Sequence, residues 1–177
     1  MRDVGKDEYR DAMARLGAAV SVITTDGPAG RTGFTASAVC SVTDAPPTLL
    51  VCVNRASAAH GCLLKNRTIA VNVLRAKDED LSRHFSSKVP ASERFAAASW
   101  SVLQTGAPVL ENAVVTFDCR VASIHGVGTH DVFYCEVVAI RRNDDEEAAL
   151  LYYNRRYHEV GKVLKSPDGD FEIIEWQ

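Results

Sequence analysis

The sequence predicts a mainly β protein with short helices, arranged as a closed or split antiparallel barrel. The chain contains a series of about seven short segments rich in β-branched residues, most of them separated by turn residues. These segments do not alternate with long helical patterns, which argues against a doubly wound nucleotide-binding fold. A length of 177 residues with 46% hydrophobic and 24% charged residues suits one domain with a buried core. We therefore expect a single domain over residues 1–177.

The first half of the chain combines helical and strand patterns. Acidic residues followed by apolar residues at helical spacing, with Gly17 as a stop, predict the first helix. Pro46-Pro47 marks a turn between two strands, because proline cannot donate to the ladder of a central strand. Ser57 is a candidate helix cap. The expected elements are helices over 7–16 and 57–65 and strands over 18–25, 32–42, 48–54 and 68–74.

The second half contains the clearest strands of the chain. Residues 114–124 and 132–140 flank a glycine-containing loop at 125–130, and this pattern predicts a long hairpin. The other elements expected here are a helix over 78–85, a helical turn over 92–97, a charged turn over 143–147 and a last strand over 150–157.

Charge and hydropathy exclude several classes of partner. A formal net charge of -3, a pI near 5.9 and the absence of a Lys/Arg cluster argue against nucleic-acid binding. No apolar run is long enough to span a bilayer, and the first residues lack the apolar core of a signal peptide. A cytoplasmic protein without a membrane partner is the expectation.

The cysteines and histidines do not form a metal-binding pattern. The odd count of five cysteines, without a CxxC pair, predicts small buried thiols in a reducing compartment and no disulfide framework. No pair of histidines has the spacing of ligands on one helix face, so no metal is expected. His60 and His84 are expected to be surface or packing residues, and Glu111, Asp118 and Glu136 ordinary strand-end or surface charges.

Two glycine-containing segments predict turns. Residues 27–33 lack the spacing of a P-loop, because Thr25 and Arg31 stand where that motif needs Gly and Lys. Gly126 and Gly128 lack the third glycine of a dinucleotide fingerprint and lie between two strands. Hairpin turns are the simplest interpretation of both.

The most informative segment is residues 33–54, a run of small and hydroxyl-bearing residues followed by the proline turn and an apolar strand. It has two interpretations. The first is a hairpin with Ser and Thr on its wet face. The second is a binding surface, because small residues let a flat ligand approach the backbone and hydroxyls can bind phosphate or carbonyl oxygens.

This segment resembles the flavin reductase family that serves two-component flavin monooxygenases. The same ordered pattern includes residues 9–13 and 17–25 and returns at Gly128-Thr129-His130 and at residues 155–158, so it spans most of the chain before about Val160. The resemblance implies a split antiparallel β-barrel of the FMN-binding type, usually a homodimer with flavin bound near the subunit interface.

The resemblance also implies the site residues. His130 is the expected catalytic residue, placed on the open face of the flavin where it orients the nicotinamide. Arg55 departs from the pattern, and its guanidinium could reach a phosphate or simply be solvated. The implied cofactor-binding residues are Thr35, Ala36, Ser37, Ser41, Val42 and Thr43 around the isoalloxazine and ribityl chain, Asn54 and Ser57 near the ribityl-phosphate end, Ser82 and Phe85 near the phosphate, and Tyr157 and His158 along the groove, with His130 beside the nicotinamide.

The function implied is NAD(P)H:flavin oxidoreduction, with hydride passing from NADH to FAD or FMN and reduced flavin leaving for a separate monooxygenase, hydroxylase or halogenase. NADH is expected over NADPH. No Ser-His-Asp or paired-carboxylate pattern is present, and hydride transfer to flavin requires none. The alternatives are a non-enzymatic flavin-binding carrier on the same barrel and an enzyme resembling pyridoxamine phosphate oxidase.

Overall fold

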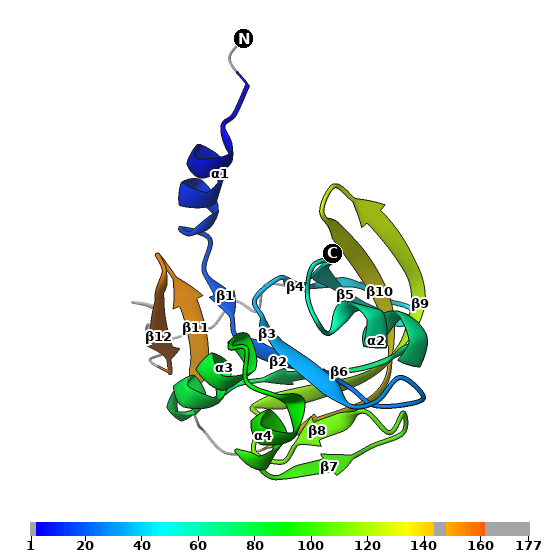
Figure 1. Cartoon of the computed structure of the whole chain (residues 1–177). Coiled ribbons are helices and arrows are strands. Elements are labelled where there is room, and N and C mark those ends of the chain that lie inside the picture. Colours follow the sequence, from blue (N-terminus) through cyan, green and yellow to red (C-terminus); the bar gives the residue numbers. More distant parts are fainter. Residues whose placement is uncertain (1–2, 144–147, 162–177) are drawn as a thin grey trace.

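The computed structural model describes residues 3–143 and 148–161 and is built around one curved antiparallel sheet (Figure 1). The seven strands of this sheet pair in the order β3-β2-β6-β9-β10-β5-β4. Their bounds are β2 Ser21–Thr25, β3 Thr32–Ala36, β4 Val39–Asp44, β5 Pro47–Asn54, β6 Thr68–Val73, β9 Val115–Val127 and β10 His130–Arg142.

The two edges of the sheet are consecutive in the chain. β3 ends at Ala36 and β4 begins at Val39, so a link of two residues, Ser37 and Ala38, joins the edges. The edge strands do not pair with each other in the described sheet, so the barrel is split between them. The split antiparallel architecture predicted from the sequence is confirmed.

Two smaller sheets lie against this barrel. β1 (Ala18–Ala19), β11 (Ala149–Tyr153) and β12 (Arg156–Val160) form one, in the order β1-β11-β12. β7 (Trp100–Val102) pairs with β8 (Pro108–Leu110) in the other. Val20 lies between β1 and β2, where its N–H donates to Leu150 and its carbonyl accepts from Leu74. The chain therefore changes sheets at this residue.

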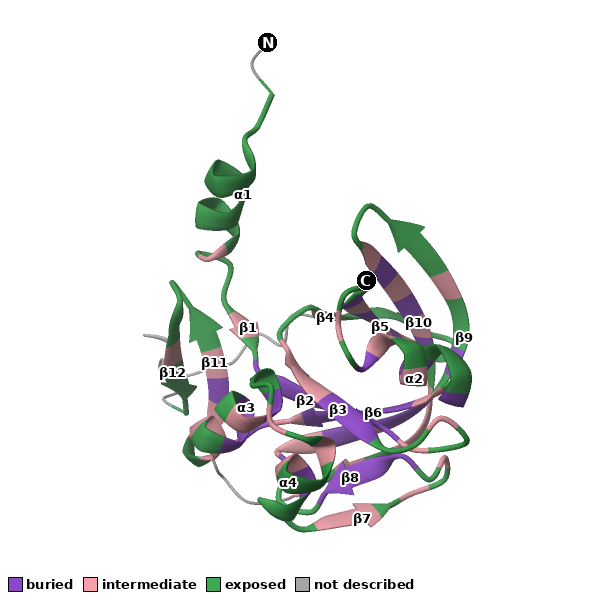
Figure 2. Ribbon diagram, viewed as in Figure 1, coloured by how far each residue is buried: buried purple, intermediate pink, exposed green. Residues whose placement is uncertain are grey.

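Short helices close the ends of the barrel or stand outside it. α2 (His60–Asn66), the 3₁₀ turn η1 (Ala76–Asp78), α3 (Glu79–Ser86) and α4 (Ala91–Ala96) pack on the sheets. α1 (Lys6–Met13) extends away from the body of the molecule and buries none of its residues (Figures 1 and 2). Among the described residues, no helix has the length and hydropathy needed to cross a membrane.

The core lies on both faces of β2 and β6. One cluster, which includes Ile23, Val51 and Phe133, fills the barrel. A second cluster, which includes Val22 and Phe85, lies on the opposite face under α3, α4 and β11. All five residues of β2 are buried (Figure 2), because both faces of this strand are covered.

Several element boundaries differ from the sequence expectations. The strand expected over 18–25 breaks at Val20, and the strand expected over 32–42 breaks at residues 37–38. The last strand is a hairpin, because Asn154 and Arg155 adopt positive φ angles of 48° and 59° and reverse the chain. Strands β7 and β8 were not expected, and part of the predicted charged turn, 144–147, lies outside the described residues.

The central hairpin is longer than expected. Most of the loop predicted at 125–130 is strand, since β9 continues to Val127 and β10 begins at His130. Only Gly128 and Thr129 form the turn, and Gly128 has a positive φ of 54° that favours glycine. His130 is therefore the first residue of a strand.

Candidate functional site

A chain of hydrogen bonds joins three of the predicted cofactor-binding residues. The Thr35 hydroxyl, on β3, donates to the Ser82 carbonyl of α3 over 2.6 Å. The Ser82 hydroxyl lies 2.9 Å from the Tyr157 hydroxyl of β12. Arg83 covers the Tyr157 ring, with its guanidinium carbon 5.0 Å from the ring centre. Because Ser82 itself has no exposed surface, it holds the Tyr157 hydroxyl in place and leaves the surface to Tyr157 and Arg83.

A broad groove of about 1160 Å³ opens beside this cluster, between α1 and the link that joins the sheet edges. Ser37 of that link lines the groove, while Tyr152 at its other side packs edge-on against Tyr157 at 5.5 Å. Arg155, also in the groove, is ion-paired with Asp11 of α1. The groove also borders Ala14, Gly17, Ala18, Ala38, Val39, Cys40 and Cys52.

The predicted residues Asn54, Ser57 and His130 come together at the end of the central hairpin. His130 is the register partner of Asn54 across β10 and β5. The Asn54 side-chain oxygen accepts from the Ala56 N–H at 2.9 Å, and its carbonyl accepts from the Ser57 N–H at 2.9 Å. The His130 Nδ1 lies 2.9 Å from the Thr129 hydroxyl, so the imidazole has one ring nitrogen left for a ligand.

Ser41, Val42 and Thr43 lie apart from both groups, on the exposed edge strand β4. Ser41 and Thr43 border an apolar groove of about 320 Å³ whose other side includes Ile140. Val42 and Ile140 are 45% and 55% exposed, so this edge presents apolar side chains on the surface. Ala36, half-buried at the end of β3, packs on the core cluster inside the barrel.

Neither Phe85 nor His158 lines the broad groove: Phe85 lies in the core, and His158 borders a different cleft. Phe85 is 1% exposed and packs against Phe95 and Trp100 in the core. His158 directs Nε2 to the Tyr153 carbonyl at 3.2 Å and borders a separate cleft of about 420 Å³. Both residues therefore adjoin the group formed by Thr35, Ser82, Arg83 and Tyr157 (the Tyr157 cluster), but no described hydrogen bond joins them to it.

Three residues that sequence reasoning did not assign to the site form a charged cluster near His130. The Asp131 carboxylate accepts from Arg55 Nε at 2.8 Å and from His60 Nε2 at 2.7 Å. Hydrogen bonds from Arg55, and then from His60, lower the pKa of Asp131 below its ordinary value. The only sequence feature that pointed to Asp131 was its position directly after His130. Its partners His60 and Arg55 lie 71 and 76 positions earlier in the chain, and pairs so far apart leave no local sequence pattern.

Two other expectations need correction. Asp118 is fully buried, not a surface charge, and its carboxylate accepts from the Thr105 N–H at 2.8 Å and from the Thr105 hydroxyl. Cys40 is exposed, whereas Cys119 and Cys135 are buried as expected. Burial raises the pKa of Cys119 far above its ordinary value and that of Cys135 to about 12, so these two thiols stay protonated.

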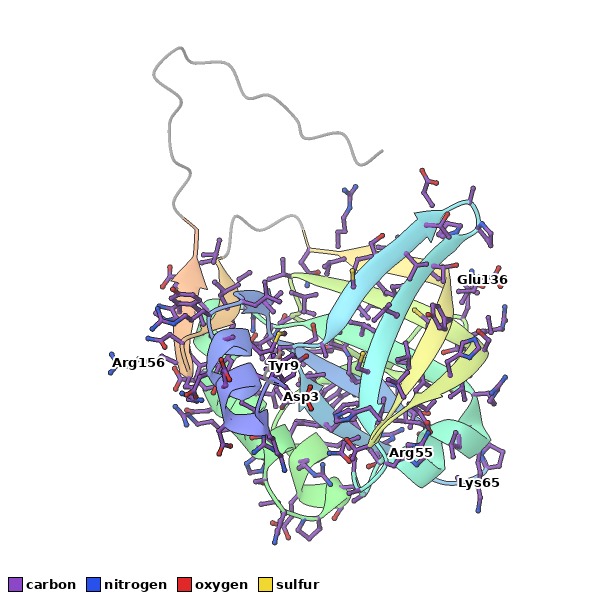
Figure 3. All side chains as sticks on the ribbon, turned by 90° about the horizontal axis from the view of Figure 1, so that it is seen from above. Asp3, Tyr9, Arg55, Lys65, Glu136 and Arg156 are labelled. Carbon is purple, nitrogen blue, oxygen red and sulfur yellow. The ribbon has the colours of Figure 1, made fainter. Side chains whose placement is uncertain are left out.

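The groove combines small residues at the sheet split with arginines in a neighbouring cleft. Ser37 and Ala38 are small and exposed on the groove side of the sheet split, so a flat ring system can approach the backbone there. The neighbouring cleft is lined by Glu79, Arg83, Tyr152, Arg155, Arg156 and Tyr157. Arg83 is ion-paired with Glu79 and Arg155 with Asp11, so a phosphate bound here would share these two arginines with carboxylates. Figure 3 shows Arg156 extending outward at this side of the molecule, opposite the side that carries Arg55. Among the described residues, no group of three His, Cys, Asp or Glu side chains could hold a metal ion.

The sequence and the fold of this chain are similar to those of known proteins. A protein from Bradyrhizobium diazoefficiens named FMN reductase (NADH) RutF is 60% identical over 161 residues, covering 91% of this chain and 89% of its own length. The solved Streptomyces globisporus NADH:FAD oxidoreductase SgcE6 is 28% identical, with a TM-score of 0.81 over 89% of this chain and 96% of that one.

BorF, the flavin reductase component of a bacterial two-component tryptophan halogenase, gives a TM-score of 0.82 at 26% identity over 90% of this chain and all of its own. The family model of the flavin reductase like domain matches residues 13–161, which include the sheet split, the Tyr157 cluster and the His130 hairpin. The chain belongs to the flavin reductase like domain family.

Proposed function

We propose that this chain is an NADH-dependent flavin reductase that releases reduced flavin to a separate monooxygenase, hydroxylase or halogenase. The observation that carries the proposal is 60% identity, over 91% of the chain, to a protein named as an NADH-dependent FMN reductase. The relation to BorF, the reductase component of a two-component system, supports the transfer of reduced flavin to a partner. Bound flavin would accept the hydride at its own N5, so the protein need only bind, orient and shield the reactants.

The described residues divide this work between two parts of the site. The groove at Ser37 would hold the flavin ring, and Tyr157 with Arg83 and Arg156 would bind the phosphate end. His130 would donate a hydrogen bond to the nicotinamide carboxamide or to the pyrophosphate, because its half-buried imidazole lies at the start of β10 and only Nδ1 contacts the Thr129 hydroxyl. Holding the two rings in contact lowers the entropic part of the barrier to hydride transfer.

The finer preferences follow from the same relatives. FMN is the proposed flavin and NADH the proposed nucleotide, because both appear in the name of the relative from Bradyrhizobium diazoefficiens. SgcE6 uses FAD by name at 28% identity, which is a more distant comparison. A cytoplasmic location and a single domain over 1–177 stay predictions.

The functional unit is proposed to be a homodimer. α1 buries none of its residues, while Tyr9, Met13 and Leu16 recur at helical spacing and are 58%, 43% and 64% exposed. The apolar edge at Val42 and Ile140 supplies a further surface for a second copy. Size-exclusion chromatography with light scattering should give twice the 19.3 kDa mass of one chain. A single-chain mass at micromolar concentration would contradict the dimer.

The enzymatic proposal is tested by following NADH absorbance with purified protein in the presence of FMN, FAD or neither, and again with NADPH. Rapid oxidation that depends on added FMN and prefers NADH is the expected result. Flavin binding without turnover in any combination would favour the carrier or oxidase interpretation.

The role of His130 is tested separately by His130→Ala, which should raise KM for NADH more than KM for flavin. His125→Ala is the matched control, since His125 is an exposed histidine of the same hairpin that packs on Tyr134. Equal effects of His130→Ala on both KM values would refute an orienting role for His130.

A further inference from the structure

The two-residue turn before His130, Gly128 and Thr129 (the His130 turn), is held by contacts from Arg55 and its partners. Arg55, which follows β5, donates from its backbone N–H to the Thr129 carbonyl at 3.1 Å and from Nη1 to the Gly128 carbonyl at 3.3 Å. It therefore binds both residues of the two-residue turn. Figure 3 shows Arg55 between the end of the central hairpin and α2.

Two other nitrogens of the Arg55 guanidinium contact Asp131, the residue after His130. Nε donates to Asp131 Oδ1 at 2.8 Å, and Nη2 lies 2.7 Å from the same oxygen, so both nitrogens converge on one carboxylate oxygen in a charge-assisted pair. The other oxygen, Oδ2, accepts from His60 Nε2 at 2.7 Å. The Arg55 guanidinium therefore contacts the hairpin through all three of its nitrogens, although its side chain is 48% exposed.

His60 connects the Arg55–Asp131 pair to the core. The His60 side chain is 14% exposed, lies at the first position of α2 and meets the Phe133 ring edge-on at 6.2 Å. Asp131 is itself only 8% exposed. Gly126 completes the fit, because a Cβ at this residue would lie 2.2 Å from Arg55 Nη2. The guanidinium therefore lies directly on the β9 backbone.

We propose that Arg55, Asp131 and His60 are positioning residues that fix the His130 turn for nicotinamide binding. The inference rests on the proposed function of His130. The contacts involve residues 128, 129 and 131, on either side of His130, so they restrict the backbone from which its imidazole projects. A turn of two residues at an exposed hairpin end would otherwise sample many conformations, and each would lower the fraction of enzyme able to bind NADH.

The experiment compares Asp131→Asn, His130→Ala and the double variant in steady-state assays that vary NADH and FMN separately. Asp131→Asn keeps the shape of the side chain and removes its charge, so KM for NADH should rise about tenfold while KM for FMN changes less than about twofold. In the His130→Ala background the same substitution should add less than about twofold. Full additivity of the two effects on KM for NADH would overturn the proposal.

Asp26→Asn is the matched control, because Asp26 forms an Arg–Asp pair with Arg31 at the β2–β3 turn. It should leave both KM values unchanged. Arg55→Gln provides a second variant of the cluster at a more exposed position, with the same KM pattern expected as for Asp131→Asn.

Hydrogen exchange separates this proposal from the proposed role of His130. Peptides covering residues 125–131 should exchange faster in Asp131→Asn than in the wild type, without any nucleotide present. Unchanged exchange there would overturn the positioning role, whatever the kinetics. If exchange is faster in Asp131→Asn but KM for NADH is unchanged in His130→Ala, then the cluster does order the turn, and it is the proposed role of His130 in nicotinamide binding that is wrong.

Discussion

At the scale of single residues, the candidate site depends on hydroxyl groups that hold one another. Ser82 is buried and reaches the Tyr157 hydroxyl, while its carbonyl accepts from Thr35. Tyr157 thus forms the surface of the candidate site, and the residues behind it determine where its hydroxyl lies. A change at Tyr157 should therefore affect flavin binding more than the chemical step.

Tyr157→Phe should raise KM for FMN about fivefold and leave kcat nearly unchanged, because a neutral hydrogen bond contributes about 1 kcal/mol. Steady-state kinetics with FMN varied at saturating NADH make the measurement. Tyr153→Phe is the control, since Tyr153 is 40% exposed and packs on His158 outside the Tyr157–Ser82 pair. A fall in kcat at unchanged KM would contradict a binding role for the Tyr157 hydroxyl.

The sequence indicates candidate residues for the site but not the contacts between them. The register of β5 and β10 places Asn54 beside His130, which the sequence does not show. The Asp131 cluster was missed because its members come from three separate elements and only tertiary contact relates them. Asp118 was misjudged for a similar reason, since its burial depends on the loop that brings Thr105 to it.

At the scale of elements, β3 and α3 are in close contact at a glycine. A Cβ on Gly33 would lie 2.8 Å from the Ile23 carbonyl oxygen and 2.9 Å from Cε1 of Phe85. The Phe85 ring therefore packs on bare backbone, which fixes α3 against the strand that carries Thr35. The glycine is needed for close approach and not for an unusual backbone conformation.

Gly33→Ala should lower the free energy of unfolding by about 1–3 kcal/mol, the usual cost of overpacking a core. Urea denaturation measures the change. Gly61→Ala is the matched control on α2, because nothing lies within 4 Å of its added Cβ and alanine favours a helix. Gly61→Ala should be neutral or stabilising. Equal destabilisation by both substitutions would show that space at Gly33 is not the cause.

Element boundaries show where sequence periodicity stops being informative. The β-branched runs at 18–25 and 32–42 have the pattern of continuous strands, yet both are broken. The first divides into β1 and β2, which belong to different sheets, and the second into β3 and β4, which are the two edges of the seven-stranded sheet. The break at Val20 is set by Leu74 and Leu150, which are distant in sequence. The β2–β3 and β9–β10 hairpins were predicted, since turn residues are local, whereas the β11–β12 hairpin was read as one strand. Strands β7 and β8, of three residues each, were too short to detect.

At the scale of the whole molecule, the sheet closes on itself except at the link of Ser37 and Ala38, and the groove opens there. At this groove, residues of α1 near the start of the chain, such as Asp11, lie beside Arg155 of the β11–β12 hairpin near its end. At the other end of the sheet, the Asp131 carboxylate of β10 accepts hydrogen bonds from Arg55 and from His60 of α2. Its ionisation should therefore contribute to global stability.

The sign of this contribution follows from the lowered pKa of Asp131. In the unfolded chain the carboxyl has a pKa of about 3.9, so folding favours the ionised form. The stabilisation is present above that value and is lost as the pH falls through the lower folded pKa. Arg55 and His60 are the charged or titratable partners that contact the carboxylate.

Urea midpoints of the wild type and Asp131→Asn should therefore differ most near neutral pH, with the wild type more stable, and converge as the pH falls below about 4. The variant serves as its own reference for all other carboxyl groups, because these titrate in both proteins. A difference that stays constant from pH 7 to pH 3 would assign the loss to the shape of the side chain and not to its charge.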